Sequence, residues 1–238
     1  MSSDAVHKRF SESAKRLADL EESRRESVRE RIRRFVVPSG EERVLDLGTG
    51  TGALAFALAP LVREVVGVDI VPEMLEEARK RAQEFPNVRF VEANLTKLPP
   101  DLGPFELSAT ARTLHHVARP ELALAEMTRA TMPGGRMLVV DSIAPIDPLA
   151  ALVVNRFERA RDPSHTRTLS DADLRGMFEA NGLVLLRSEV EHDHEDVEEY
   201  LDRAGCVGEA RERALSAAPA RGSYIKEVGW YLLSKPGF

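Results

Sequence analysis

The chain has 238 residues, of which 43% are hydrophobic and 30% charged, a balance typical of a soluble globular protein and not of a disordered one. Its net charge of −6 argues against a broad phosphate-binding surface, so nucleic acid is not expected as a partner. The lone Cys206 excludes a disulfide within the chain, and the lack of an apolar leader or a membrane-length apolar run leads us to expect a cytoplasmic protein with no membrane span.

Two amphipathic helices are predicted within residues 1–37. Apolar side chains recur at the spacing of one helix face at Phe10, Ala14 and Leu17, and again at Val28, Ile32 and Phe35. The second stretch is rich in arginine, but glutamates interleave with these arginines, and Glu21–Arg25 and Glu30–Arg34 have the spacing of helical salt bridges. We therefore expect a solvated helix face here in place of a basic arm for nucleic acid.

From residue 43 onward, short apolar runs alternate with helical segments. The predicted strands are Arg43–Leu47, Glu64–Asp69, Val88–Val91, Phe105–Thr110 and Arg136–Asp141. The predicted helices between them lie near residues 52–62, 72–85 and 119–131. This alternation with short connections indicates a parallel sheet covered by helices on both faces, which is a Rossmann-like doubly wound α/β core.

After Asp141 the alternation becomes irregular. Helices are predicted near residues 148–160 and from an N-cap at Ser170 to Asn181-Gly182, and late strands at Leu183–Val190 and Gly229–Lys235. We expect the late strands to form an antiparallel edge pair, which gives a seven-stranded mixed sheet with five parallel strands. Residues 1–37 would form a helical lid, residues 38–238 the main domain, and residues 142–181 the wall of an acceptor pocket.

The strongest motif is the segment VLDLGTGTGA at residues 44–53, which leads from a strand through a glycine-dense turn into a helix. Glycine is needed where the backbone bends tightly and a ligand approaches closely. Gly48, Gly50 and Ala53 satisfy a dinucleotide fingerprint, and Asp69 ends the second strand, so a nicotinamide-dependent oxidoreductase fits this pattern. Asp46 argues against it, because a carboxylate at the mouth of the strand would repel a pyrophosphate.

A carboxylate beside the loop suits S-adenosylmethionine, which carries an amino group and a sulfonium but no phosphate. Over residues 36–190 the sequence resembles the class I S-adenosylmethionine-dependent methyltransferases, in the small-molecule branch that includes the quinone-methylating enzymes. The resemblance rests on D-x-G-x-G-x-G at 46–52, Val68-Asp69 followed by Met74-Leu75, Leu98-Pro99, Leu114-His115-His116-Val117 and Pro133-Gly134-Gly135.

The resemblance implies a set of cofactor-binding residues and a small-molecule methyl acceptor. The set is Asp46, Gly48, Thr49, Gly50, Gly52, Asp69, Ile70, Met74, Asn94, Leu95, Ala111 and Arg112. Within it, Asp69 would accept the ribose hydroxyls, and Ile70 and Met74 would lie against the adenine. Asn94 stands where the family commonly has an aspartate that accepts the adenine amino group, and its amide oxygen would replace that acceptor.

Methyl transfer from a sulfonium needs mainly alignment, so a general base is optional. The candidate bases are His115 and His116, which follow the fourth strand, and His165, which lies in the irregular region; each could instead be a structural loop residue. His192 and His194 share one strand face, but the acids around them favour a solvated edge, so no metal is expected. A non-catalytic module that binds S-adenosylmethionine is a further alternative.

Overall fold

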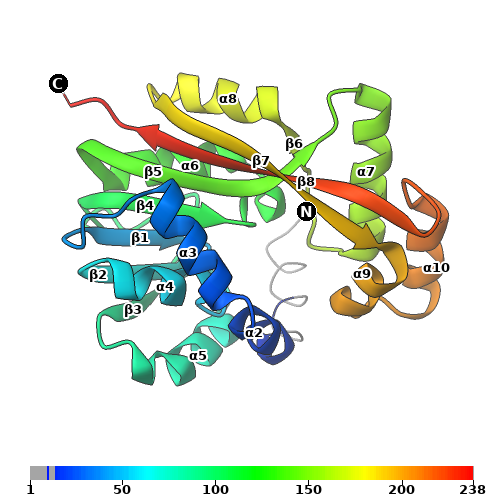
Figure 1. Cartoon of the computed structure of the whole chain (residues 1–238), viewed down its shortest axis with the longest axis horizontal. Helices are drawn as coiled ribbons and strands as arrows, with labels where there is room; N and C mark the ends of the chain where they lie inside the picture. Colours follow the sequence, from blue (N-terminus) through cyan, green and yellow to red (C-terminus); the bar gives the residue numbers. More distant parts are fainter. Residues whose placement is uncertain (1–9, 11–13, 238) are drawn as a thin grey trace.

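A central sheet with the strand order β3-β2-β1-β4-β5-β8-β7 organises the molecule (Figure 1). The computed structural model describes residue 10 and residues 14–237. The strands are β1 (Arg43–Leu47), β2 (Glu64–Asp69), β3 (Val88–Glu92), β4 (Phe105–Ala111), β5 (Thr131–Ala144), β7 (Val184–Asp196) and β8 (Ser223–Ser234). Strands β1 to β5 are parallel, and β8 is antiparallel to both β5 and β7. The predicted core of five parallel strands with an antiparallel edge pair is confirmed.

The late strands differ from the prediction in their extent. The pairing of β7 with β8 continues to Asp196 opposite Ser223, so both strands are longer than their apolar runs indicate. Strand β5 begins at Thr131, with the predicted chain break at Pro133-Gly134-Gly135 inside it, where the register against β4 shifts. An additional two-residue strand, β6 (Leu169–Ser170), pairs with the end of β5.

Helices cover both faces of the sheet, as predicted. They are α2 (Ala14–Glu22), α3 (Arg25–Phe35), α4 (Ala53–Leu58), α5 (Pro72–Arg81), α6 (Pro120–Ala130), α7 (Pro148–Arg161), α8 (Asp171–Ala180), α9 (Val197–Ala204) and α10 (Gly208–Ala217). Proline occupies the first position of α5, α6 and α7, where its missing N–H costs no hydrogen bond. Ser170 and Asp173 form the capping box expected at the start of α8. Helices α9 and α10 were not predicted.

The hydrophobic core has one layer on each face of the sheet. One layer packs α6 and α8 against strand residues such as Leu45 and Tyr231. The other layer packs α3 and α4 against the sheet and includes Ile32, Phe35 and Trp230. The ring of Phe35 meets that of Trp230 edge-on at 5.6 Å. Helix α3 is therefore part of the core.

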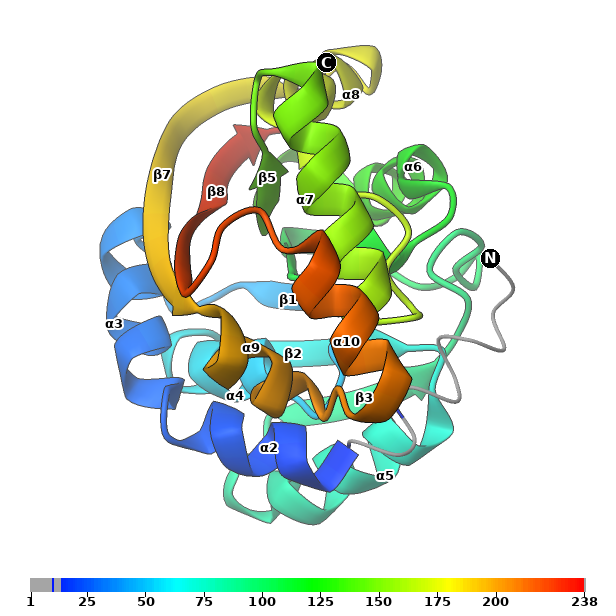
Figure 2. The same ribbon diagram turned by 90° about the vertical axis from the view of Figure 1, so that its right-hand side faces the viewer.

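The carboxyl ends of the parallel strands are covered by a separate group of helices. Figure 2 looks onto this edge and shows α7, α9 and α10 together on it, with α2 beside α5. A third apolar cluster, which includes Phe157, Tyr200 and Leu201, holds α7, α9 and α10 together. These helices thus lie over the edge of the sheet at which the parallel strands end.

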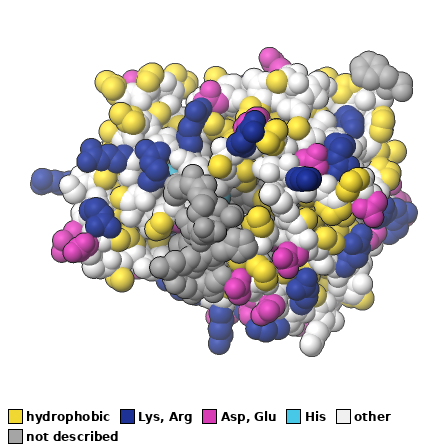
Figure 3. Space-filling view, turned by 180° about the vertical axis from the view of Figure 1, so that it is seen from behind, with side chains coloured by type: hydrophobic (Ala, Val, Ile, Leu, Met, Phe, Trp, Pro, Cys, Tyr) yellow, Lys and Arg dark blue, Asp and Glu magenta, His cyan; other side chains and the backbone are white. Residues whose placement is uncertain are grey.

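The outer surface mixes both signs of charge. On the described part of the face seen in Figure 3, arginine and lysine side chains lie dispersed among acidic and apolar ones. In the part of the chain that the structure describes, no helix is both long enough and apolar enough to cross a bilayer.

Candidate functional site

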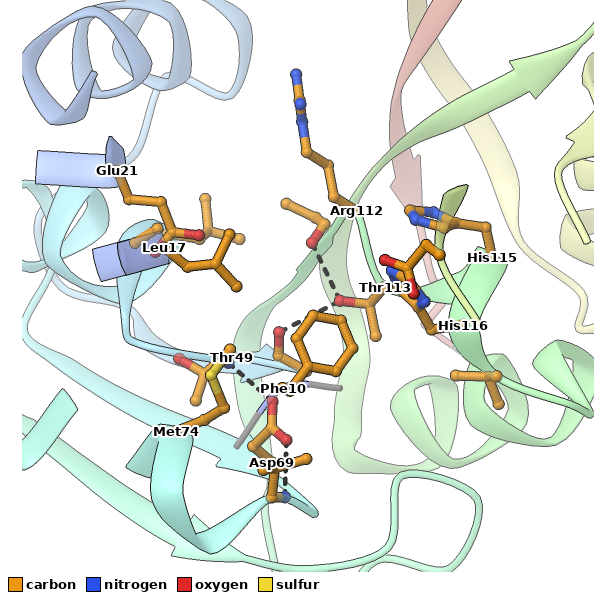
Figure 4. A pocket seen from close by; sticks show the side chains of 18 of the residues that line it. Phe10, Leu17, Glu21, Thr49, Asp69, Met74, Arg112, Thr113, His115 and His116 are labelled. Carbon is orange, nitrogen blue, oxygen red and sulfur yellow. Dashed lines mark hydrogen bonds between the residues drawn. The ribbon is translucent and has the colours of Figure 1, made fainter. Parts of the chain in front are cut away.

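A cavity of about 650 Å³ lies at the carboxyl ends of β1, β2 and β4 (Figure 4). This is the edge at which ligands of open α/β sheets bind. Its walls come from the glycine loop after β1, the end of β2, the turn after β4, helices α2, α7 and α9, and strand β8. The cavity brings together most of the sequence-predicted residues: Asp46, Gly48, Thr49, Gly50, Asp69, Ile70, Met74, Asn94, Leu95, Ala111, Arg112, His115 and His116.

Two predicted site residues do not line this cavity. Gly52 has a φ of 92°, and a Cβ there would come within 2.6 Å of the Phe56 ring, so side-chain packing requires this glycine. His165 is 1% exposed, and its Nε2 lies 3.2 Å from Oδ1 of Asn155. The buried position of His165 therefore contradicts its predicted role in the acceptor pocket.

Asp46 is a buried carboxylate with one oxygen in use. Its Oδ2 accepts a hydrogen bond of 2.6 Å from the Thr49 hydroxyl, whereas its Oδ1 makes no well-formed hydrogen bond within the described chain, although the Ala55 N–H lies near enough to the carboxylate to favour its ionised form. Burial, with a contribution from the neighbouring Asp69, raises the pKa of Asp46 to about 7. An unsatisfied carboxylate oxygen in a cavity wall is suited to a cationic ligand.

Asp69 ties the glycine loop to the end of β2. Its Oδ2 accepts the Gly50 N–H over 2.8 Å, and its Oδ1 accepts the Val71 N–H over 3.0 Å. Figure 4 shows the Asp69 side chain at the base of the cavity. A carboxylate can accept further hydrogen bonds beside these two, so the ribose role expected of Asp69 fits its environment.

Thr113 fixes the other side of the loop. Its hydroxyl lies 3.2 Å from the carbonyl oxygen of Gly48 and 3.0 Å from that of Ala111 (Figure 4). A Cβ at Gly48 would lie 2.2 Å from the Thr113 side chain, so the absence of a side chain at Gly48 allows the loops after β1 and β4 to meet.

The residues predicted to face the adenine are apolar except for Asn94, and the hydrogen bonds of Asn94 differ from the expectation. Met74 and Leu95 are buried, and Ile70 packs beside Met74. Asn94 lines the cavity, yet its Oδ1 accepts hydrogen bonds of 2.9 and 2.8 Å from the amide and hydroxyl of Thr96. The acceptor expected for an adenine amino group is thus already occupied, which leaves the Nδ2 of Asn94 as a donor.

Arg112 has a strained backbone at the cavity rim. Its φ of 55° lies in the left-handed region, which a residue with a side chain seldom adopts. The Arg112 N–H donates to the Val140 carbonyl over 2.8 Å, and its guanidinium lies 3.4 Å from Oδ2 of Asp193 on β7. Such strain persists where surrounding contacts hold it and is concentrated at functional sites.

His115 and Asp141 form a hydrogen-bonded pair. The His115 Nδ1 contacts Oδ1 of Asp141, and its backbone N–H donates to Oδ2 over 3.2 Å. Although burial opposes it, the His115 imidazole holds the pKa of Asp141 below its ordinary value. Because an ionised carboxylate only accepts, the pairing assigns a proton to Nδ1 of His115, and Nε2 is the ring nitrogen that the carboxylate does not contact.

His116 belongs to a second polar chain. Its Nδ1 lies 3.0 Å from the Ser164 hydroxyl, which donates to Oδ1 of Asp162 over 2.6 Å. Since the hydroxyl proton goes to Asp162, Nδ1 of His116 donates to Ser164. Burial, reinforced by His115, lowers the pKa of His116 to about 3, so this imidazole is neutral near pH 7.

Helix α2 contributes cavity residues that the sequence did not reveal. Glu21, expected on a solvated face with Arg25, instead contacts the Thr51 hydroxyl of the glycine loop, and burial raises its pKa. Arg25 pairs with Glu22. The ring of Phe10 meets that of His116 edge-on at 5.0 Å, and residues 1–9 and 11–13 of the predicted lid lie outside the described chain.

The wall formed by α7, α9 and β8, called the far wall below, includes segments that the sequence did not predict. Residues 142–181 supply Arg161, Asp162 and Thr166, but α9 and β8 contribute Tyr200, Arg203 and Lys226. No signal in the sequence connects these remote segments. His192 and His194 are exposed on β7, and within the described residues no three His, Cys, Asp or Glu side chains are placed so that they could hold a metal ion.

Comparison with known proteins gives a consistent result. A family profile described as "Methyltransferase domain" matches residues 38–204. The uncharacterized methyltransferase YcgJ of Bacillus subtilis is 41% identical over 145 residues, which span 60% of this chain and 57% of that protein. A demethylmenaquinone methyltransferase of Clavibacter sepedonicus is 29% identical over 205 residues, 85% of this chain and 81% of that protein. The crystal structure of YcgJ superimposes with a TM-score of 0.82 at 28% identity, covering 89% of this chain and 99% of that one.

Proposed function

Because the chain belongs to the methyltransferase-domain family and resembles its ubiquinone/menaquinone group, we propose that it transfers the methyl group of S-adenosylmethionine to a small-molecule acceptor by in-line displacement. The observation that carries the choice of donor is Asp46, whose Oδ1 is buried in the cavity wall without a well-formed hydrogen bond in the described chain. The ammonium of the methionine part supplies the charged donor that this oxygen lacks.

The remaining loop residues fit the same ligand. Gly50 has no side chain to obstruct the cavity, and a Cβ there would come within 3.3 Å of Met74. Asp69 would hold the ribose hydroxyls, and Met74 with Ile70 would face the adenine. When bound, the cofactor supplies an activated methyl group, so the protein has to align the acceptor and exclude water.

His115 is the best-placed general base in this cavity for an acceptor that must lose a proton. In the neutral imidazole its Nε2 would accept the proton, and the Asp141 carboxylate on Nδ1 would stabilise the imidazolium that forms. His116 is less suited, since its pKa of about 3 makes it a weak base at neutral pH. We assign His116 a positioning role through Ser164.

The two alternatives are less well supported. A nicotinamide enzyme would place a pyrophosphate on the glycine loop beside the buried carboxylate of Asp46, which is an unfavourable neighbour for phosphate. The family match favours an enzyme over a non-catalytic binding module. Turnover with any acceptor would exclude that module.

Titration calorimetry with S-adenosylhomocysteine and NADH tests the choice of cofactor. We expect S-adenosylhomocysteine to bind and NADH not to bind. Asp46→Asn should weaken binding of S-adenosylhomocysteine, whereas the matched change Asp101→Asn at an exposed position should not. Binding of NADH in place of S-adenosylhomocysteine would overturn the proposal.

A further inference from the structure

The far wall of the cavity gathers positive charge around one phenol ring. Tyr200 has Arg161 at 4.3 Å, the Nζ of Lys226 at 5.2 Å and Arg203 at 5.6 Å from its ring centroid. All four side chains line the cavity that also contains the glycine loop. Like charges so close in a partly buried wall repel one another unless anions accompany them.

The neighbouring carboxylates are already engaged. Glu158 is buried and accepts from Arg161 over 2.8 Å and from the Tyr200 hydroxyl over 3.0 Å. Although burial opposes it, Arg161 and Lys226 hold the pKa of Glu158 to about 2. Arg203 pairs with Glu195. Glu158 and Glu195 thus form ion pairs with Arg161 and Arg203, respectively.

Lys226 lies close enough to Glu158 to lower the pKa of that carboxyl, but it shares Glu158 with Arg161 and forms no ion pair of its own in the described residues. Its Nζ donates to the Tyr200 oxygen over 3.0 Å, and the Tyr200 proton goes to Glu158. No carboxylate in the described residues forms an ion pair with Lys226. Asp162, which also lines this wall, accepts the Ser164 hydroxyl. An ammonium has three donors, so Lys226 retains donors for a ligand.

Resting on the proposed methyl transfer, we propose that the acceptor carries a carboxylate and that Lys226, assisted by Arg203, binds it. A carboxylate presents two oxygens to the remaining donors and offsets the positive charge around Tyr200. His115 lines the same cavity, so an acceptor held at Lys226 stays in the compartment of the proposed base and cofactor. Lys226 is then a specificity-determining residue for the acceptor.

The test compares benzoate with benzamide, which have similar size and differ in charge. Both are titrated by NMR or calorimetry into the full chain saturated with S-adenosylhomocysteine. We expect the affinity for benzoate to exceed the affinity for benzamide by about tenfold or more. Lys226→Met should remove this preference without changing the affinity for S-adenosylhomocysteine, and Lys226→Arg should retain it.

A lysine elsewhere provides the matched control. Lys80, 70% exposed on α5, does not line the cavity, so Lys80→Met should behave as the wild type. Equal affinities for benzoate and benzamide, or a preference that persists in Lys226→Met, would overturn the inference while the proposed function stands. If Lys226→Met failed to bind S-adenosylhomocysteine, the comparison of benzoate with benzamide in the wild-type protein would still decide whether the cavity prefers a carboxylate. A wild-type protein that does not bind S-adenosylhomocysteine would overturn both proposals.

Discussion

The backbone N–H of Gly50 donates to Oδ2 of Asp69 over 2.8 Å, so the tip of the glycine loop is fastened to the end of the neighbouring strand. One carboxylate thus orders the loop and faces the cavity in which the ribose is expected. Asp69 therefore has a structural role in the loop in addition to the ligand role predicted for it.

We expect Asp69→Ala to weaken binding of S-adenosylmethionine by about tenfold or more, because each hydrogen bond to a charged group contributes ~1.5–3 kcal/mol. Calorimetry measures the affinity, and circular dichroism checks that the fold is intact. Asp101→Ala is the control at an exposed position. An unchanged affinity in Asp69→Ala would remove this residue from the cofactor site.

Gly50→Val should abolish cofactor binding. The φ of 55° at this position is unfavourable for a β-branched residue, and the new Cβ would come within 3.3 Å of Met74. Gly176→Val, at an exposed helical position where a Cβ meets nothing within 4 Å, is the control. If Gly50→Val binds S-adenosylhomocysteine as the wild type does, the loop has a structural role only.

Cofactor affinity should fall as the pH drops below 7. The pKa of Asp46 is raised to about 7, so below that pH the carboxyl is neutral and must lose a proton before it can pair with a cation. Well below pH 7 the affinity should decrease by about tenfold per pH unit. Titrations from pH 5 to 8 measure this slope, and Asp46→Asn should lack it. A flat profile in the wild type would show that Asp46 does not contact a cationic group.

His115→Gln should lower kcat by about 10²–10⁴-fold for an acceptor that loses a proton, because a positioned base contributes that much. Asp141→Asn should lower kcat in the same direction by disturbing the imidazole. Release of S-adenosylhomocysteine measures turnover, and its affinity should stay unchanged in both variants. His192→Gln, at an exposed position on β7, is the control. Full activity in His115→Gln would refute the assignment of the base.

Helix α2 should gain protection from hydrogen exchange when S-adenosylhomocysteine binds, because Leu17 and Glu21 line the cavity. Helix α3 is an internal reference, since Ile32 and Phe35 are buried in the core and should exchange slowly in both states. Deleting residues 1–20 should reduce turnover far more than thermal stability. Equal protection of α2 in both states would contradict the proposed lid.

The sheet could be predicted because its strands are apolar runs bounded by strong turn signals. Strands β7 and β8 are longer than predicted. Asp196 and Ser223 are not apolar, and they belong to these strands because they pair with each other across the ribbon. Lys226 and Tyr200 reach the cavity from segments that only the folded sheet brings together. Pairing between distant segments leaves little trace in local sequence.

Two errors at the site have a common cause. The glycine pattern at Gly52 looks the same whether a ligand or the Phe56 ring needs the space. The turn before His165 likewise looks the same whether the imidazole faces a cavity or is buried beside Asn155. Burial is a property of tertiary structure, so residue type and spacing could not distinguish these cases.

The strand order has a consequence for the order in which the molecule can assemble. Strand β8 stands between β5 and β7, although it follows both in the chain. On the ribosome, the glycine loop and Asp69 emerge with their neighbouring strands, whereas β7 gains its place in the sheet only after residue 234 has been made. A nascent chain can therefore complete its cofactor-facing half while the wall with Lys226 is still missing. Under the proposed function, a chain still being synthesised would bind its cofactor before it can select an acceptor.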